Sequence, residues 1–181
     1  MQAVDAPRLT ARFVLSDEAA TARLGSALAR GIEASTEAII RTGLVLGLSG
    51  ELGSGKTALV RALLRRLGVD GPVRSPTFSL LELYAVPRLN FYHFDFYRFS
   101  DPLDFASSGF RDFFGPGSVC AIEWPERAGE TNLNIDLLIR MQVADRGRVA
   151  QIDALSDTAE QCLQETGQAW QIEPESDGGA C

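Results

Sequence analysis

A lysine and a threonine end a glycine-rich segment whose pattern is typical of phosphate binding. Residues 50–57 read Gly-Glu-Leu-Gly-Ser-Gly-Lys-Thr and fit the Walker A pattern G-x-x-x-x-G-K-[ST] without a mismatch. An apolar run at residues 44–48 precedes it and a helical pattern at residues 58–67 follows, which predicts a strand, a loop and a helix. Glycines let main-chain N–H groups approach a polyphosphate, and the helix N-terminus adds a positive field. Lys56 would then offer a charge to the γ-phosphate, and Thr57 a hydroxyl ligand to Mg²⁺.

The composition favours a nucleotide site over a turn that merely joins a strand to a helix. Lys56 is the only lysine among the 17 Lys and Arg residues of the chain. A sequence that otherwise uses arginine therefore has a compact ammonium at the one position where a phosphate loop needs it. A structural glycine turn is the alternative, and the flanking strand and helix patterns make it the weaker one.

Two apolar runs end in an acid, Asp95 after residues 90–94 and Glu123 after residues 119–122. Ligands of open α/β sheets gather at the carboxyl ends of strands, so either acid could serve a metal ion near the phosphates. The alternative for each is a solvated acid at a strand end. Thr77 is a candidate switch residue whose hydroxyl senses the γ-phosphate or its metal, and it fits a simple turn residue equally well.

The histidine and cysteine content excludes several other kinds of site. His93 is the only histidine, so a two-histidine zinc site is impossible. It lies two residues before Asp95 on the same strand face, and we interpret it as structural, as a lone histidine in an aromatic strand usually is. Three cysteines without paired spacing predict neither disulfides nor zinc, and Cys120 is expected in the core. Glu51 replaces the second glycine of a nucleophile elbow, which excludes that motif.

Length and composition indicate one globular domain. With 181 residues, of which 45% are hydrophobic and 23% charged, the chain can build a proper core. It contains no apolar run of membrane-spanning length, and residues 1–10 lack the form of a signal peptide. We therefore expect a cytoplasmic protein with no membrane partner.

The negative charge is concentrated near the C-terminus. The net charge is −7, and residues 153–181 contain seven Asp or Glu and no Lys or Arg, so residues 1–152 are balanced. Such a surface predicts no DNA binding, and contact with RNA would require another protein. We predict a P-loop domain over residues 1–155 and an acidic tail over residues 156–181, with one helix followed by disordered chain.

The remaining pattern predicts alternating strands and helices without an internal repeat. The expected elements are a strand at 9–15, a helix capped by Ser16 and ended by Gly31, strands at 79–86 and 89–97 that form a hairpin or lie as near neighbours, a short helix at 101–109, a strand at 119–123, paired strands at 137–141 and 149–152 around Gly147, and a helix from 156 to about 168.

Four segments are similar, in order and spacing, to one bacterial family. They are residues 50–57, Ser-Pro-Thr-Phe at 75–78, His-Phe-Asp-Phe-Tyr-Arg at 93–98 and Ile-Glu-Trp-Pro at 122–125. Together they resemble TsaE, the small ATPase of tRNA threonylcarbamoyladenosine synthesis, and the resemblance covers most of the chain before the tail. It implies a single P-loop α/β domain whose mixed, mostly parallel sheet is flanked by helices. It also implies slow ATP hydrolysis that matters in complex with TsaD and TsaB, which act on the tRNA.

The resemblance also implies roles for individual residues. Thr57 and Glu123 would hold Mg²⁺, Thr77 would lie in the nucleotide-sensing loop, and Asp95 would be needed for turnover. Trp124 would sit near the site. The residues that would surround the phosphates are Gly53, Ser54, Gly55, Lys56, Thr57 and Ala58. The positions matching the adenosine end of the nucleotide are Asp17 and Gly147.

The chain departs from the family pattern in a few places. Ala58 replaces a second threonine but keeps its backbone N–H, and Ser54 replaces a common alanine. Leu103 and Asp104 stand where two glutamates are typical, which puts the partner-facing role of that segment in doubt.

Other functions of a phosphate loop give alternative hypotheses. A small-molecule or nucleotide kinase would use the same loop, but the arginines after residue 100 are scattered and indicate no lid. A GTPase is disfavoured because the chain has no Asn-Lys-x-Asp motif. A nucleotide-gated binding module, in which hydrolysis only resets partner affinity, is compatible with the TsaE-like interpretation.

Overall fold

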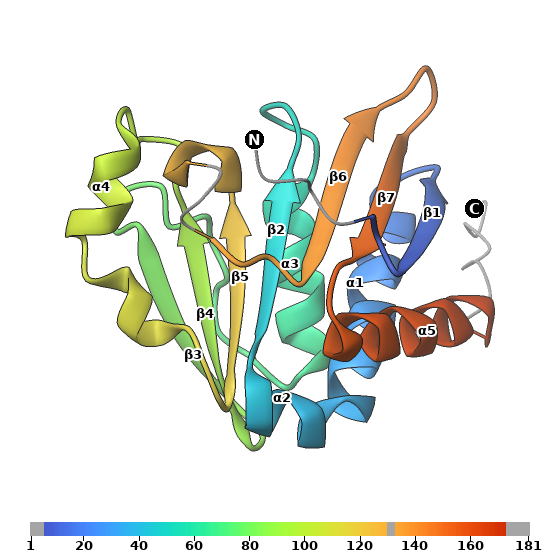
Figure 1. The fold of residues 1–181 in the computed structure, drawn as a ribbon. Coiled ribbons are helices and arrows are strands. Elements are labelled where there is room, and N and C mark those ends of the chain that lie inside the picture. Colours follow the sequence, from blue (N-terminus) through green and yellow to red (C-terminus); the bar gives the residue numbers. More distant parts are fainter. Residues whose placement is uncertain (1–5, 130–132, 173–181) are drawn as a thin grey trace.

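A seven-stranded mixed sheet, in the order β1-β7-β6-β2-β5-β4-β3, organises the chain (Figure 1). The computed structural model describes residues 6–129 and 133–172. The strands are β1 (Leu9–Leu15), β2 (Leu44–Ser49), β3 (Leu81–Val86), β4 (Leu89–Asp95), β5 (Ser118–Glu123), β6 (Leu137–Val143) and β7 (Arg148–Ala154). The helices are α1 (Glu18–Ala34), α2 (Thr36–Thr42), α3 (Lys56–Arg66), α4 (Pro102–Ser107) and α5 (Asp157–Ile172), with short 3₁₀ turns η1 (Phe110–Phe113) and η2 (Pro125–Ala128).

The centre of the sheet is parallel and its margins are antiparallel. Strands β4, β5, β2 and β6 run parallel, while β3 pairs with β4 as the predicted hairpin, and β6, β7 and β1 form antiparallel pairs. The predicted mixed α/β sheet flanked by helices is confirmed. The register places Glu123 opposite both Asp95 on β4 and Leu48 on β2. Parallel pairing therefore brings the two predicted acids to the same edge of the sheet, beside the strand that leads into the phosphate-loop pattern.

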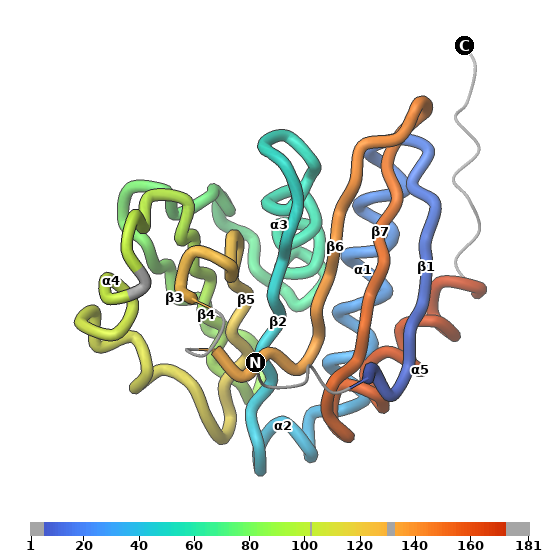
Figure 2. The backbone as a smooth tube through the Cα atoms, turned by 45° about the horizontal axis from the view of Figure 1, so that its top comes forward, coloured from blue at the N-terminus to red at the C-terminus, as the bar shows by residue number. Residues whose placement is uncertain are grey.

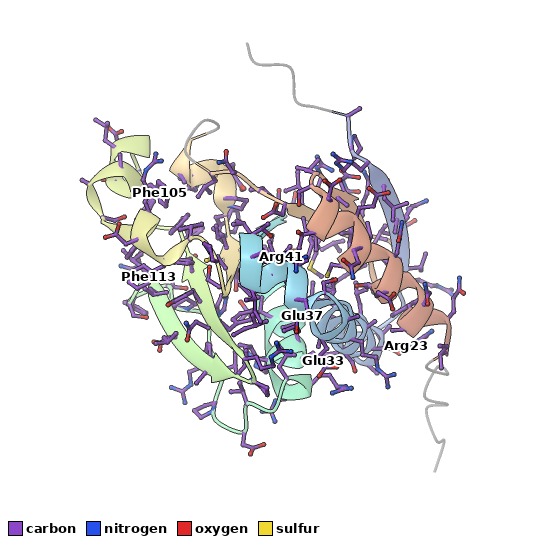
Figure 3. All side chains as sticks on the ribbon, turned by 60° about the horizontal axis from the view of Figure 1, so that its bottom comes forward. Arg23, Glu33, Glu37, Arg41, Phe105 and Phe113 are labelled. Atoms are coloured by element: carbon purple, nitrogen blue, oxygen red, sulfur yellow. The ribbon has the colours of Figure 1, made fainter. Side chains whose placement is uncertain are left out.

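The two faces of the sheet build two apolar clusters because side chains alternate along each strand. On one face, Leu44, Leu46 and Leu48 of β2 join the core formed with α1, α3 and α5. Figure 2 shows α1 and α3 side by side against the sheet. On the other face, aromatic rings dominate the cluster. For example, the ring centroids of Phe96 and Phe105 are 5.6 Å apart. Phe105 is labelled in Figure 3, where it lies at the end of the molecule formed by α4 and η1.

The N-terminal helix differs from its prediction at both ends. Asp17, not Ser16, is its N-cap: the Asp17 side chain accepts a 2.8 Å hydrogen bond from the backbone N–H of Ala20. The helix also continues through Gly31, which was expected to end it, as far as Ala34. Gly31 is buried where α1 meets α5, and a Cβ there would lie 2.4 Å from the carbonyl oxygen of Cys162. The glycine therefore permits close helix packing instead of terminating the helix.

Replacing Gly31 with alanine should lower the free energy of unfolding by up to about 2 kcal/mol, because the new methyl group overpacks the α1–α5 contact at a cost of about 1–3 kcal/mol. This cost should exceed the gain of about 1 kcal/mol that alanine brings to a helix interior. Gly167→Ala is the matched control, since Gly167 lies in α5 and a Cβ there would meet no atom within 4 Å. Urea unfolding should show the control stabilised or unchanged; equal behaviour of the two variants would contradict the packing explanation.

The acidic C-terminal segment contains the predicted helix, which runs slightly further than expected. Helix α5 spans Asp157–Ile172, and its buried Ala159, Cys162 and Leu163 belong to the same core as α1. At its far end, the guanidinium carbon of Arg23 lies 3.8 Å from the centroid of the Trp170 ring. The described part of this segment is thus packed onto the sheet domain. Residues 173–181, predicted to be disordered, lie outside the described residues.

The two described cysteines are buried residues of the core. Cys120 and Cys162 are both free and buried, and burial raises the pKa of each thiol to about 12. Both therefore remain protonated and unreactive at neutral pH, which confirms the prediction for Cys120. Across residues 6–129 and 133–172, the structure has no helix with the length and apolarity needed to cross a bilayer.

Candidate nucleotide site

The phosphate-loop pattern forms a tight turn between β2 and α3, seen above β2 in Figure 1. Its three glycines all have positive φ: +144° at Gly50, +80° at Gly53 and +103° at Gly55. At Gly50 a Cβ would also lie 2.3 Å from the carbonyl oxygen of Met141 on β6. These positions exclude larger residues for reasons of backbone conformation and close approach. Helix α3 begins at Lys56, two residues earlier than predicted, so its first N–H groups belong to the loop.

The Lys56 ammonium is held inside this loop. Its Nζ donates to the carbonyl oxygens of Gly50 at 2.6 Å and Glu51 at 2.9 Å, and it lies 4.0 Å from the centroid of the Trp124 ring. Burial lowers the pKa of Lys56 below its ordinary value, and neighbouring carboxylates, with Glu123 first, act in the opposite direction. The side chain is therefore a partly desolvated cation, and an anion bound beside it would favour its charge.

A cavity of about 400 Å³ opens beside the loop. The predicted site residues that line it are Gly53, Gly55, Lys56, Thr57, Ala58, Thr77, Asp95, Glu123 and Trp124. Three others do not line it. Ser54 is fully buried and its Oγ accepts a 3.3 Å hydrogen bond from Lys56, while Asp17 and Gly147 lie elsewhere.

Thr57 and Glu123 form the pair predicted to hold a metal ion. The Thr57 hydroxyl donates to Oε1 of Glu123 at 2.7 Å, and Glu123 is only 3% exposed. Hydroxyl and carboxylate oxygens are hard ligands that suit Mg²⁺, which is commonly held by one or two protein groups together with substrate phosphates and water. In the described part of the chain, no cluster of three or more His, Cys, Asp or Glu side chains could bind a metal. The donor set thus fits an ion that arrives with a polyphosphate.

Asp95 connects the end of β4 to the segment before β3. Its Oδ2 accepts hydrogen bonds from the hydroxyls of Thr77, at 2.7 Å, and Ser75, and its Oδ1 accepts from the backbone N–H of Tyr97 at 2.9 Å. Ser75 and Thr77 also contact each other at 3.0 Å. The sequence predicted roles for Thr77 and Asp95, whereas Ser75 was noted only as part of the Ser-Pro-Thr-Phe segment at residues 75–78. The hydroxyls of Ser75 and Thr77 therefore connect the loop before β3 to Asp95, which lines the cavity.

His93 contacts the site more directly than its interpretation as a structural residue implied. Its Nε2 lies 2.9 Å from Oε1 of Glu123, and its side chain is fully buried. The spacing that puts His93 and Asp95 on one strand face was visible in the sequence. The contact itself depends on the parallel pairing of β4 with β5, which places His93 opposite Ala121 and so near Glu123.

Two arginines near the loop were not predicted. Arg61 of α3 lines the cavity and donates from Nε to the carbonyl oxygen of Val73 at 2.9 Å. Arg148 lies across the loop from β7, with Nη2 3.5 Å from the carbonyl oxygen of Gly53. Nothing in the sequence pattern distinguished these arginines from the others in the chain.

Asp17 and Gly147 are brought toward each other but do not line the cavity. Gly147 turns the chain between β6 and β7 with a φ of +78°, and a Cβ there would lie 2.1 Å from the carbonyl oxygen of Leu15 and 2.7 Å from that of Ser16. Gly147 therefore abuts the segment that leads into the Asp17 cap. Each residue has a structural reason for its identity, and their contact with adenosine stays a prediction.

Comparisons with known proteins agree on one family. The family model described as "Threonylcarbamoyl adenosine biosynthesis protein TsaE" matches residues 15–150. The protein named "tRNA threonylcarbamoyladenosine biosynthesis protein TsaE" of Haemophilus influenzae is 39% identical over 105 residues, which cover 58% of this chain and 66% of that protein. The protein of the same name from Treponema pallidum is 35% identical over 127 residues, which cover 70% of this chain and 87% of that protein.

A solved structure has a similar fold. The crystal structure of Bacillus subtilis YdiB has a TM-score of 0.66 and 26% sequence identity, and the match covers 88% of this chain and 94% of that one. The family match spans the phosphate loop, the Ser75–Thr77–Asp95 cluster and the Thr57–Glu123 pair. The chain belongs to the TsaE family.

Proposed function

We propose that this protein is an ATPase that acts in the synthesis of threonylcarbamoyladenosine in tRNA. The observation that carries the proposal is that three functional groups share one cavity: the phosphate loop with Lys56, the Thr57–Glu123 pair, and Asp95 with its two hydroxyl partners. The assignment to tRNA modification is supported by the relatives, which are named for threonylcarbamoyladenosine biosynthesis.

ATP binding would use the loop N–H groups and the Lys56 ammonium. In the structure the ammonium donates to the carbonyl oxygens of Gly50 and Glu51, and a γ-phosphate would exchange these bonds for stronger ones in which donor and acceptor are both charged. Backbone N–H groups of residues 53–58 point at phosphates in such loops. Thr57 and Glu123 would hold Mg²⁺, which when bound neutralises charge on the phosphate oxygens.

Hydrolysis would depend on Asp95. A carboxylate beside the γ-phosphate can accept a hydrogen bond from the attacking water and orient it. Asp95 also accepts hydrogen bonds from Ser75 and Thr77, so its position depends on the segment that contains them. We propose that the Thr77 hydroxyl exchanges between Asp95 and the nucleotide, so that this segment reports whether a γ-phosphate is present.

Hydrolysis would be slow in the isolated protein and would serve tRNA modification in complex with the partners TsaD and TsaB. Leu52, which lines the cavity, and Phe78, beside Thr77, are 78% and 87% exposed. Exposed apolar side chains next to a nucleotide cavity suit a partner surface whose affinity depends on the bound nucleotide. The tRNA would be reached only through that complex, because residues 1–152 have no excess of positive charge. We place this activity in the cytoplasm, without a membrane or DNA partner.

Reconstitution tests the proposal. The purified chain is combined with TsaD, TsaB and a substrate tRNA, with and without ATP and Mg²⁺, and both modified adenosine and released phosphate are counted. We expect many modification cycles only when the chain and ATP are both present, with phosphate release stimulated by the partners. Modification that is independent of the chain, or transfer of the γ-phosphate to a small molecule without TsaD and TsaB, would reject the proposal, and the second result would favour a kinase.

A further inference from the structure

We propose that His93 is a positioning residue that fixes the Glu123 carboxylate and thereby sets the affinity of the site for Mg²⁺. The inference rests on the proposed function, because it concerns the metal that would accompany ATP. It assigns a role to a side chain that lies beneath the cavity and does not line it.

His93, Glu123 and Thr57 form a hydrogen-bonded chain that joins three elements. Oε1 of Glu123 lies 2.7 Å from the Thr57 hydroxyl of α3 and 2.9 Å from Nε2 of His93 on β4. A carboxylate only accepts hydrogen bonds, so both neighbours must donate to the same oxygen. Both hydrogen bonds from described residues therefore fall on Oε1, and Oε2 remains for a further ligand. The Thr57 hydroxyl also keeps its lone pairs for a cation, because its hydrogen is directed at Glu123.

The other nitrogen of His93 argues against a role in packing alone. Nδ1 is buried and has no hydrogen-bond partner among the described residues. A buried nitrogen without a partner is unfavourable, so an apolar residue would fill this position better if packing were the only requirement. The preceding position on this face of β4 is apolar, since it is occupied by the fully buried Phe91. What histidine offers here, and phenylalanine does not, is the Nε2–H donor directed at Glu123.

A donor behind a metal-binding carboxylate has a known kind of effect. Such partners hold the ligand in one orientation, and their loss commonly costs 10–100-fold in metal affinity. Glu123 is the last residue of β5. The hydrogen bonds from His93 on β4 and from Thr57 on α3 restrict the orientation of the Glu123 carboxylate. The carboxylate would therefore be preorganised before a metal ion binds.

Two amide substitutions separate the donor from the bulk of the ring. His93→Gln can place its amide nitrogen near the position of Nε2, whereas the shorter His93→Asn reaches only the position of Nδ1. The Mg²⁺ concentration for half-maximal nucleotide binding is measured with a fluorescent ATP analogue, nucleotide affinity is measured in EDTA, and Mn²⁺ binding is counted by EPR. We expect His93→Asn to raise the half-saturating Mg²⁺ concentration about 10-fold or more. His93→Gln should remain within about 3-fold of the wild type, and affinity in EDTA should change little in either variant.

The outcomes distinguish this inference from the proposed function. Equal Mg²⁺ dependence in both variants and the wild type, with only the melting temperature lowered, would show a merely structural residue and overturn the inference alone. An equal loss in both variants would overturn it as well, because the donor would then be irrelevant. A wild-type protein that binds no nucleotide, or binds it without regard to Mg²⁺, would overturn the proposed function and the inference together. If His93→Asn does not fold, His93→Phe, which removes both nitrogens, replaces it with the same expected loss.

Discussion

Lys56→Ala should abolish measurable ATP binding. The ammonium is the one lysine charge of the chain, and the loop holds it at the wall of the cavity. Two opposite unit charges about 4 Å apart near a protein surface attract by about 4 kcal/mol, which corresponds to about a 1,000-fold change in affinity. Isothermal titration with ATP and Mg²⁺ measures the effect directly.

Two further variants separate the charge of Lys56 from its other contacts. Lys56→Met keeps most of the length of the aliphatic stem but removes the ammonium, and it should bind ATP as poorly as the alanine variant if charge is the cause. Arg65→Ala removes a positive charge from an exposed position on the same helix and should leave affinity within about 2-fold, since exposed charges are screened by salt. Retention of near-normal affinity by Lys56→Met, in a protein that still unfolds cooperatively, would show that the loop does not bind phosphate as proposed.

Local patterns predicted the loop well because its causes are local. Positive φ values at Gly53 and Gly55, and the short reach from Lys56 back to the carbonyl oxygens of residues 50 and 51, all arise within eight residues. The joint placement of Asp95 and Glu123 could be expected because apolar runs that end in acids indicate parallel strands, and the carboxyl ends of parallel strands share an edge.

The remaining features depend on contacts between distant segments. Gly31 looked like a helix end, but it permits contact with Cys162, a residue 131 positions away. The role of His93 required the register between β4 and β5, and Ser75 required the loop before β3 to fold back over Asp95. A pattern read along one segment cannot supply a partner on another, and helix ends are decided by tertiary packing as well as propensity.

Asp95→Ala should leave ATP affinity within about 3-fold and lower partner-stimulated hydrolysis by about 100-fold or more, the usual range for a group that assists proton transfer or orients water. The carboxylate lines the cavity but belongs to β4, on the opposite side of Glu123 from the loop strand β2, so it has no part in gripping the phosphates. Removing it therefore affects a step after binding. Equilibrium titration with ATP and phosphate release in the presence of TsaD and TsaB measure the two quantities separately.

Ser75→Ala serves to separate catalysis from loop positioning. This variant keeps the carboxylate and the hydrogen bond from Thr77, at 2.7 Å, but removes the second hydroxyl from Oδ2. If Asp95 acts on the water itself, Ser75→Ala should lose much less activity than Asp95→Ala, by about 10-fold or less. If Asp95 serves only to hold the segment, Ser75→Ala, which removes one of the two hydroxyl bonds, should show a large part of the loss seen in Asp95→Ala. Intact partner-stimulated hydrolysis in Asp95→Ala would exclude both roles. The variant would then be active without the carboxylate and without its hydrogen bonds to Ser75 and Thr77.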